Sequence, residues 1–391
     1  MDIEITKSKI IAEAEAHRNE LYDLSQRIHD NPELGFHEVK ASQWLTGYLE
    51  KYGFAIERGV SGLDTAFRAT YGKGSPMIAL LAEYDALPKL GHACGHNIIA
   101  AAAVGGGVAA RPAIDKYGGT LMVIGTPAEE LYGGKVTMCQ KGIFNELDAA
   151  MMVHPGNHDT VVTEALALQG IEVEFFGKPS HAAGRPEAGI NALEAMILSF
   201  NSINSLRQHI RSKARIHGII TDGGQAANVV PAHSAGTFMV RAADETYLAE
   251  LKQKVLNCFM GAALATGARL EYKWDELCYL PVRNNLTIGK LFLQNMRRTG
   301  RKTRMSDPGQ SFGSTDFGNV SQLVPGVHAS VSITSRRIVV NHSPQFAEAA
   351  VSEKGLQSVV DAAKGLALTV ADLVADPEQI KKARAEFLKS K

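Results

Sequence analysis

The sequence has no net charge and no long apolar run, and each absence excludes a class of protein. Its 391 residues include 41 basic and 41 acidic side chains. No basic stripe or acidic tail stands out, so nucleic acid and anionic membrane surfaces are poor candidates as partners. The longest apolar run, residues 98–110, is too short and too rich in glycine to span a bilayer.

Cysteine is scarce, with four residues that show no paired spacing. The first residues are polar and charged and do not resemble a signal peptide. We therefore expect reduced thiols and a cytoplasmic location.

Two common catalytic motifs are missing. The chain has no Gly-x-x-x-x-Gly-Lys-[Ser/Thr] phosphate loop and no Gly-x-Ser-x-Gly nucleophile elbow. A loose dinucleotide-binding pattern at residues 105–110 falls inside an expected helix rather than after a strand, so we discard it.

What is present is ordinary globular composition, 45% hydrophobic and 21% charged, in a chain longer than one core usually supports. The first part alternates helices and apolar strands, which indicates an α/β layer architecture. Expected helices cover residues 6–30, 37–52, 95–110 and 134–141, and expected strands cover residues 65–71, 77–82, 120–125 and 149–153.

The pattern changes near residue 169 to strand, helix, strand, strand, helix, strand, which is typical of a small α+β domain. The strands are expected at 170–176, 214–221, 234–241 and 268–274, and the helices at 191–210 and 245–266. After Pro281 the α/β pattern returns, with a helix at 287–298, a strand at 327–333 and a helix at 354–374. We therefore predict a discontinuous domain of residues 1–168 and 282–391, with an inserted domain of residues 169–281.

Cys94 and His96 lie in the run GHACGHN (residues 91–97), after an apolar strand and at the start of a helix. The tip of a strand is where α/β sheets place their sites, and a Cys-x-His pair in a loop can bind one zinc-like ion. The alternative is a small buried thiol beside a helix-capping histidine.

Glu129 and Glu130 follow another apolar strand, in the run TPAEE (residues 126–130). Adjacent carboxylates repel each other unless a cation or a shared proton compensates. A metal would let one glutamate bind the ion while the other takes a proton from bound water; a solvated pair in a loop is the alternative. Asp85, at the end of the strand 77–82, could orient a metal-binding histidine or simply cap a loop.

Several other polar residues are candidates on weaker grounds. His154 follows the strand 149–153, and His342 lies in a similar setting, so each is either a ligand or a structural histidine. In the inserted segment, His181 could donate to a reacting carbonyl, and Asn228 and Arg241 could bind an amide and a carboxylate.

Taken in order along the chain, these motifs resemble a known family. The runs EYDALP (83–88), GHACGHN (91–97), PAEE (127–130), SHAA (180–183) and NVVP (228–231) are similar to those of the aminoacylase and glutamate carboxypeptidase family of metallopeptidases. The branch is the one with aminobenzoyl-glutamate hydrolases, auxin-conjugate hydrolases and aminoacyl-lysine-type dipeptidases. The resemblance covers nearly the whole chain.

The resemblance implies a catalytic domain with a central mixed sheet between helices and an inserted ferredoxin-like lid domain that forms a homodimer. It implies two divalent ions per subunit, with Glu129 as general base, Asp85 as the carboxylate that orients a ligand, and His181 steadying the oxyanion in the partner's site. Asn228 and Arg241 would hold the substrate. The implied metal ligands are Cys94, His96, Glu130, His154 and His342.

Three positions depart from the common family pattern. Many members have His-x-Asp where this chain has Glu83-x-Asp85, and many have a bridging aspartate where it has Cys94-x-His96. The cysteine-containing branch often continues with aspartate, whereas this chain has Asn97. A thiolate favours zinc, while carboxylate and imidazole also accept manganese or cobalt.

From these residues we expect hydrolysis of the amide bond of a small N-acyl amino acid or dipeptide by metal-activated water. Two alternatives remain open. The chain could be a non-catalytic or regulatory subunit of a hydrolase pair, which would be expected to have lost a ligand or Glu129. It could also be an aminohydrolase, which would release ammonia without an amino-acid product.

Overall fold

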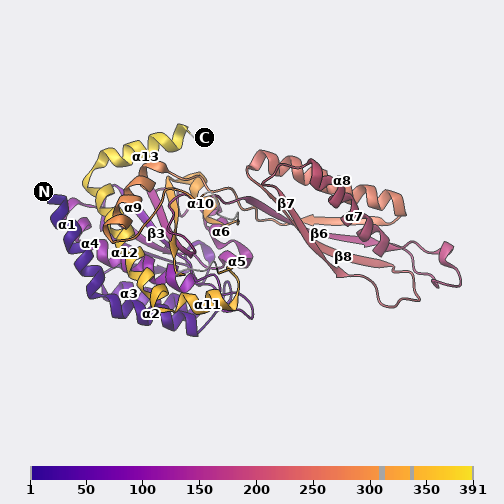
Figure 1. Cartoon of the computed structure of the whole chain (residues 1–391), viewed down its shortest axis with the longest axis horizontal. Coiled ribbons are helices and arrows are strands. Elements are labelled where there is room, and N and C mark those ends of the chain that lie inside the picture. Colours follow the sequence, from indigo (N-terminus) through magenta and orange to yellow (C-terminus); the bar gives the residue numbers. More distant parts are fainter. Residues whose placement is uncertain (1, 308–312, 335–338, 390–391) are drawn as a thin grey trace. The chain divides into compact units, whose positions relative to one another are not determined.

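The computed structural model describes residues 2–307, 313–334 and 339–389, which form two compact units (Figure 1). Unit 1 contains the chain up to Glu164 and most of the chain from Val282 onward. Unit 2 contains Ala165–Pro281 and a short stretch ending at Thr315. The first boundary thus lies a few residues before the expected one at 168, and the stretch before Asp316 joins unit 2 although no sequence pattern indicates this.

Unit 1 is built on a six-stranded mixed sheet with the order β1-β2-β4-β3-β5-β10. β3 pairs in parallel with β4 and β5, and β5 pairs in parallel with β10, whereas β2 is antiparallel to both β1 and β4. The carboxyl ends of the four parallel strands therefore meet at one edge. The strands are β1 (Ala55–Arg58), β2 (Phe67–Lys73), β3 (Met77–Ala82), β4 (Gly119–Gly125), β5 (Ala149–Gly156) and β10 (Gly326–Ser332).

Helices surround this sheet, and both of its faces are buried. Alternate residues of the central strands, such as Leu80 and Val123, pack in one apolar cluster, while their neighbours Leu81 and Ile124 pack in another. Strands buried on both faces explain the near-continuous apolar runs of the sequence. The helices are α1 (Asp2–Ala16), α2 (Arg18–Asp30), α3 (Val39–Lys51), α4 (His96–Tyr117), α5 (Glu129–Tyr132), α6 (Gly134–Gln140), α9 (Leu286–Arg298), α10 (Phe317–Leu323), α11 (Pro344–Ala350), α12 (Glu353–Ala375) and α13 (Pro377–Lys389).

The helix α4 is longer than expected, with 22 residues rather than an end near residue 110. By length and composition alone it could cross a membrane, but 89% of its most apolar window is buried inside the protein. It packs closely against α12, and both belong to the main apolar cluster.

Unit 2 has a four-stranded antiparallel sheet with the order β7-β8-β6-β9. The helices α7 and α8 pack together and against the sheet (Figure 1). This order follows the strand, helix, strand, strand, helix, strand pattern of the ferredoxin-like arrangement. The elements are β6 (Ala167–Phe176), α7 (Ala192–Leu206), β7 (Arg215–Asp222), β8 (His233–Ala242), α8 (Glu245–Thr266) and β9 (Arg269–Trp274).

The predicted α/β class is confirmed, and the differences have local causes. The helix expected over 6–30 is two helices, α1 and α2, separated at His17. The edge strand β1 was not predicted because none of its four residues is buried, so it has no apolar alternation.

Candidate metal centre

The candidate residues of unit 1 gather at the carboxyl edge of the parallel strands. Asp85 follows β3, Glu129 and Glu130 follow β4, and His154 lies near the end of β5. Cys94 and His96 lie at the start of α4, and His342 lies between β10 and α11. Segments far apart in sequence are thus brought to one place by the parallel topology.

Cys94, His96 and His154 form a compact group whose ligand atoms all lie within 4.8 Å of one another. Cys94 Sγ lies 3.4 Å from His154 Nε2. Gly95 has a φ of +78°, and a Cβ atom there would lie 2.5 Å from Pro155 Cγ. This turn therefore requires glycine, and it lets Cys94 approach the end of β5.

Asp85 holds the ring of His96 through its Nδ1 atom. The Nδ1 atom of His96 lies 3.0 Å from both the carboxylate Oδ1 and the carbonyl oxygen of Asp85. Both of these partners are acceptors, so Nδ1 carries a proton, and in the neutral ring Nε2 has a free lone pair. Within the described ranges, the buried His96 Nε2 has no hydrogen-bond partner, as expected of a metal ligand.

Glu130 and His342 contribute to a second group with Cys94, again within 4.8 Å. His342 Nε2 lies 3.2 Å from Glu130 Oε1, and the Glu130 backbone N–H donates to Asp85 Oδ2 at 3.0 Å. Asp85 therefore holds both His96 and the start of α5. His342 differs from the other candidates because its side chain is 49% exposed.

Glu129 belongs to a third group, with His96 and Glu130, and is buried. Burial raises the pKa of Glu129 well above its usual range, and the nearby carboxylates Glu83 and Glu130 raise it further. Burial also raises the pKa of Cys94, with Glu130 adding to the effect. A thiol and several carboxyl groups packed this closely are stabilised in their charged forms by a divalent cation, so the donor set fits a metal centre.

A buried ion-pair cluster beside this centre was not anticipated from the sequence. The Lys135 ammonium lies 2.6 Å from Glu83 Oε1 and 2.7 Å from Asp316 Oδ1, and all three side chains are inaccessible to solvent. Glu83 Oε2 lies 3.6 Å from His96 Nε2. Glu83, which departs from the His-x-Asp pattern expected from the family resemblance, is thus held by an internal cation. Lys135 follows Glu130 by five residues, and a lysine at this spacing is not a recognisable sign of a buried ion pair.

Replacing Lys135 by methionine is expected to destabilise unit 1 by about 3–5 kcal/mol, because two carboxylates would be left buried without their cation. Urea unfolding of the metal-free protein measures the effect, and the exposed Lys141→Met variant is the matched control. An unchanged unfolding midpoint for Lys135→Met would contradict the structural role of this cluster.

The structure places the remaining candidates in unit 2. His181 and Asn228 lie close together, because the Ala182 N–H donates to the Asn228 carbonyl and His181 pairs with Val229. The Nδ1 atom of His181 accepts from the N–H groups of Ala183 and Gly184, at 3.3 and 3.0 Å. A neutral His181 therefore carries its proton on Nε2.

Arg241 lies elsewhere in unit 2, near the end of β8, where its guanidinium donates to Ser314 Oγ at 2.9 Å. His181 and Asn228 lie beyond the start of the same strand, where the Gly177 N–H donates to the Ala232 carbonyl. A ten-residue strand spans roughly 30 Å. Within one copy of unit 2, Arg241 is therefore far from His181 and Asn228.

Comparison with known proteins identifies the family. The profile described as Peptidase family M20/M25/M40 matches residues 79–365. The Xaa-Arg dipeptidase of Mus musculus is 36% identical, over 99% of this chain and 93% of the relative. One of the subunits of the p-aminobenzoyl-glutamate hydrolase of Escherichia coli (strain K12) is also 36% identical, over 69% of this chain and 61% of the relative.

Solved structures share the fold. A putative aminohydrolase from methicillin-resistant Staphylococcus aureus matches with a TM-score of 0.80 and 18% identity, over 94% of this chain and 100% of the other. A dinuclear metal-binding M20 peptidase from Bacillus subtilis matches with a TM-score of 0.70 and 23% identity, over 92% and 99%. Because the family profile matches most of its length and a dipeptidase is 36% identical across nearly all of it, this chain belongs to peptidase family M20/M25/M40.

Proposed function

We propose that this chain is a metal-dependent hydrolase that cleaves the amide bond of a small dipeptide or N-acyl amino acid. The observation that carries the proposal is the convergence of a thiol, three imidazoles and two adjacent carboxylates at the carboxyl edge of a parallel sheet. Family membership and the dipeptidase relative support the same reaction class.

Five side chains would hold two divalent ions. Cys94, His96 and His154 would form one position, and Cys94, Glu130 and His342 the other, with Cys94 common to both. We propose zinc as the native metal because one donor is a thiolate, and the imidazole and carboxylate donors also suit manganese or cobalt.

When bound, the ions would polarise the substrate carbonyl and lower the pKa of a water molecule toward about 7. Glu129 lies beside His96 and Glu130 and belongs to neither proposed ligand group, and its carboxylate would act as the general base. It would take the proton from water and pass it to the leaving amine. Asp85 would keep His96 Nε2 directed at the ion through the hydrogen bond at Nδ1.

The residues of unit 2 would bind the substrate and its oxyanion. His181 would donate its Nε2 proton to the oxygen on which charge develops, and Asn228 and Arg241 would hold the amide and the carboxylate of the substrate. The distance between the ends of β8 supports a homodimer in which the partner's His181 and the partner's Asn228 complete each site, since one copy of unit 2 separates both residues from Arg241.

The alternative of a non-catalytic subunit is raised by the name of the Escherichia coli relative, which is one subunit of its hydrolase. A degenerate subunit would be expected to lack part of the centre. The complete group of ligands together with Glu129 favours an active enzyme.

Removing metal with a chelator is expected to lower hydrolysis by at least about 100-fold, and adding Zn²⁺, Mn²⁺ or Co²⁺ should restore it, because the ions supply the activated water. The assay is product release from a panel of dipeptides ending in arginine or lysine, aminobenzoyl-glutamate and N-acyl amino acids. Ammonia release without a free amino acid would instead identify an aminohydrolase. A metal-loaded protein with no activity on the panel would support the subunit alternative.

A further inference from the structure

His342 is the candidate ligand least supported by its surroundings. Its side chain is half exposed, whereas those of Cys94 and His96 are buried. Its backbone has a φ of +62°, in the left-handed region that non-glycine residues seldom adopt. Such a conformation persists only where neighbouring contacts enforce it. The position of the imidazole therefore depends on what holds the chain around residue 342.

Among the described residues, two neighbours bind the backbone of this segment, and each lies close to another proposed ligand. The His342 N–H donates to the carbonyl of Ala93, the residue directly before Cys94, at 2.9 Å. On the other side, Asn157 pairs with Val339. Asn157 follows His154 by three residues. The half-exposed His342 is therefore bound to chain segments next to Cys94 and His154, which are less exposed.

The contact between Asn157 and Val339 has two points. Asn157 Nδ2 donates to the Val339 carbonyl at 2.9 Å, and Asn157 Oδ1 accepts from the Val339 N–H at 2.9 Å. A primary amide offers an N–H donor and a C=O acceptor side by side, which matches the two backbone groups of Val339. Aspartate would keep the acceptor and place a negative charge against a carbonyl oxygen. Thr334 Oγ1 also donates to Asn157 Oδ1, at 3.1 Å.

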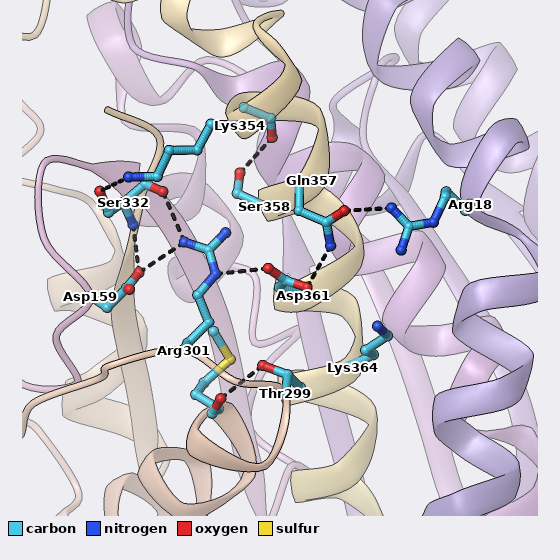
Figure 2. Close-up of polar contacts among 12 residues, drawn as sticks. Arg18, Asp159, Thr299, Arg301, Ser332, Lys354, Gln357, Ser358, Asp361 and Lys364 are labelled. Atoms are coloured by element: carbon cyan, nitrogen blue, oxygen red, sulfur yellow. Dashed lines mark hydrogen bonds and ion pairs between the residues drawn. The ribbon is translucent and has the colours of Figure 1, made fainter. Parts of the chain in front are cut away.

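A largely buried charge cluster fixes the chain just beyond Asn157. Figure 2 shows Arg301 lying between Asp159 and Asp361. Asp159 Oδ1 accepts from Arg301 and from the Ser332 N–H, at 3.2 and 2.7 Å, while Arg301 also donates to the Ser332 carbonyl at 2.9 Å. The end of β10 and the segment after β5 are thereby locked together. The segment that carries Asn157 is thus held in place by these contacts.

We propose that Asn157 is a positioning residue that holds His342 in place and so sets the affinity of the metal position formed by Cys94, Glu130 and His342. The inference rests on the proposed metal-dependent function. The position formed by Cys94, His96 and His154 does not include His342, so it keeps its affinity when the Asn157 contact is lost.

The test is metal binding by the full chain, with Zn²⁺ as the probe. Wild type, Asn157→Ala and Asn157→Asp are equilibrated against chelator-buffered Zn²⁺ at graded free concentrations, and zinc per chain is measured by elemental analysis. Loss of a residue that orients a metal ligand weakens binding by about 10–100-fold. We expect this loss for one of the two ions in both variants. Thr334→Val is the matched control, because it removes a bond to Asn157 and leaves the Val339 pairing intact, and it should bind both ions like wild type.

The outcomes separate the proposed role of Asn157 in holding His342, here called the anchor, from the proposed function. Variants that keep one ion at wild-type affinity are folded, and selective loss of the other supports the anchor. Unchanged binding of both ions, or equal weakening of both, would overturn it while leaving the metal centre intact. A wild-type protein that binds no zinc would refute the metal centre and the anchor together.

Discussion

The Glu129→Gln protein is expected to bind its metal ions and to lose kcat by a factor of about 10²–10⁴, the usual contribution of a positioned general base. Glutamine has nearly the same shape as glutamate but does not accept the water proton. Glu129 is not a member of either proposed ligand group, so the affinity for metal should change little. The measurement is steady-state hydrolysis together with zinc per chain.

The neighbouring Glu130→Gln variant is the matched control, since it replaces a carboxylate by an amide at the adjacent residue. Glu130 lies in a group with Cys94 and His342, so this variant should lose affinity for one ion. Glu130→Gln would then lose turnover together with metal, whereas Glu129→Gln would lose turnover with its metal retained. Metal-loaded Glu129→Gln with wild-type kcat would show that another residue is the base.

The sequence predicts the fold well where apolar periodicity is strong. The buried strand β3 and the amphipathic helix α8 have the expected bounds. It predicts poorly where burial is slight or where an element depends on contacts made by distant segments. The exposed edge strand β1 and the terminal helix α13, which buries only Ala383 and Phe387, are examples.

The candidate site divides in a similar way. Cys94, His96 and Glu130 are visible in sequence because their side chains are metal-binding types at the tips of apolar strands. The pairing of Lys135 with Glu83 and Asp316 is not visible, since it joins three segments that only the tertiary structure brings together. The same holds for Asn157, whose contact with Val339 crosses from the end of β5 to the segment after β10. A short amide side chain near a histidine gives no signal until its partner is known.

His181→Ala is expected to lower kcat by about 10²–10³, the loss typical of one oxyanion donor. Because His181 Nδ1 accepts two backbone N–H groups, the neutral ring has its single proton on Nε2, and alanine removes that donor. Metal content should be unaffected, since His181 is in unit 2 and the ligand groups are in unit 1. Unchanged kcat in metal-loaded His181→Ala would remove His181 from the reaction.

For the proposed homodimer, mixing two variants of low activity tests whether the partner's His181 serves each site. A mixed dimer of Glu129→Gln and His181→Ala has one site with both residues intact if His181 acts across the dimer, and none if it acts within its own chain. Random exchange of equal amounts would then restore about one quarter of wild-type activity, since half of the dimers are mixed and each has one working site. The assay is hydrolysis after subunit exchange, with each variant alone as the baseline. Activity that stays at the baseline, in a mixture shown to contain mixed dimers, would place His181 in the site of its own subunit.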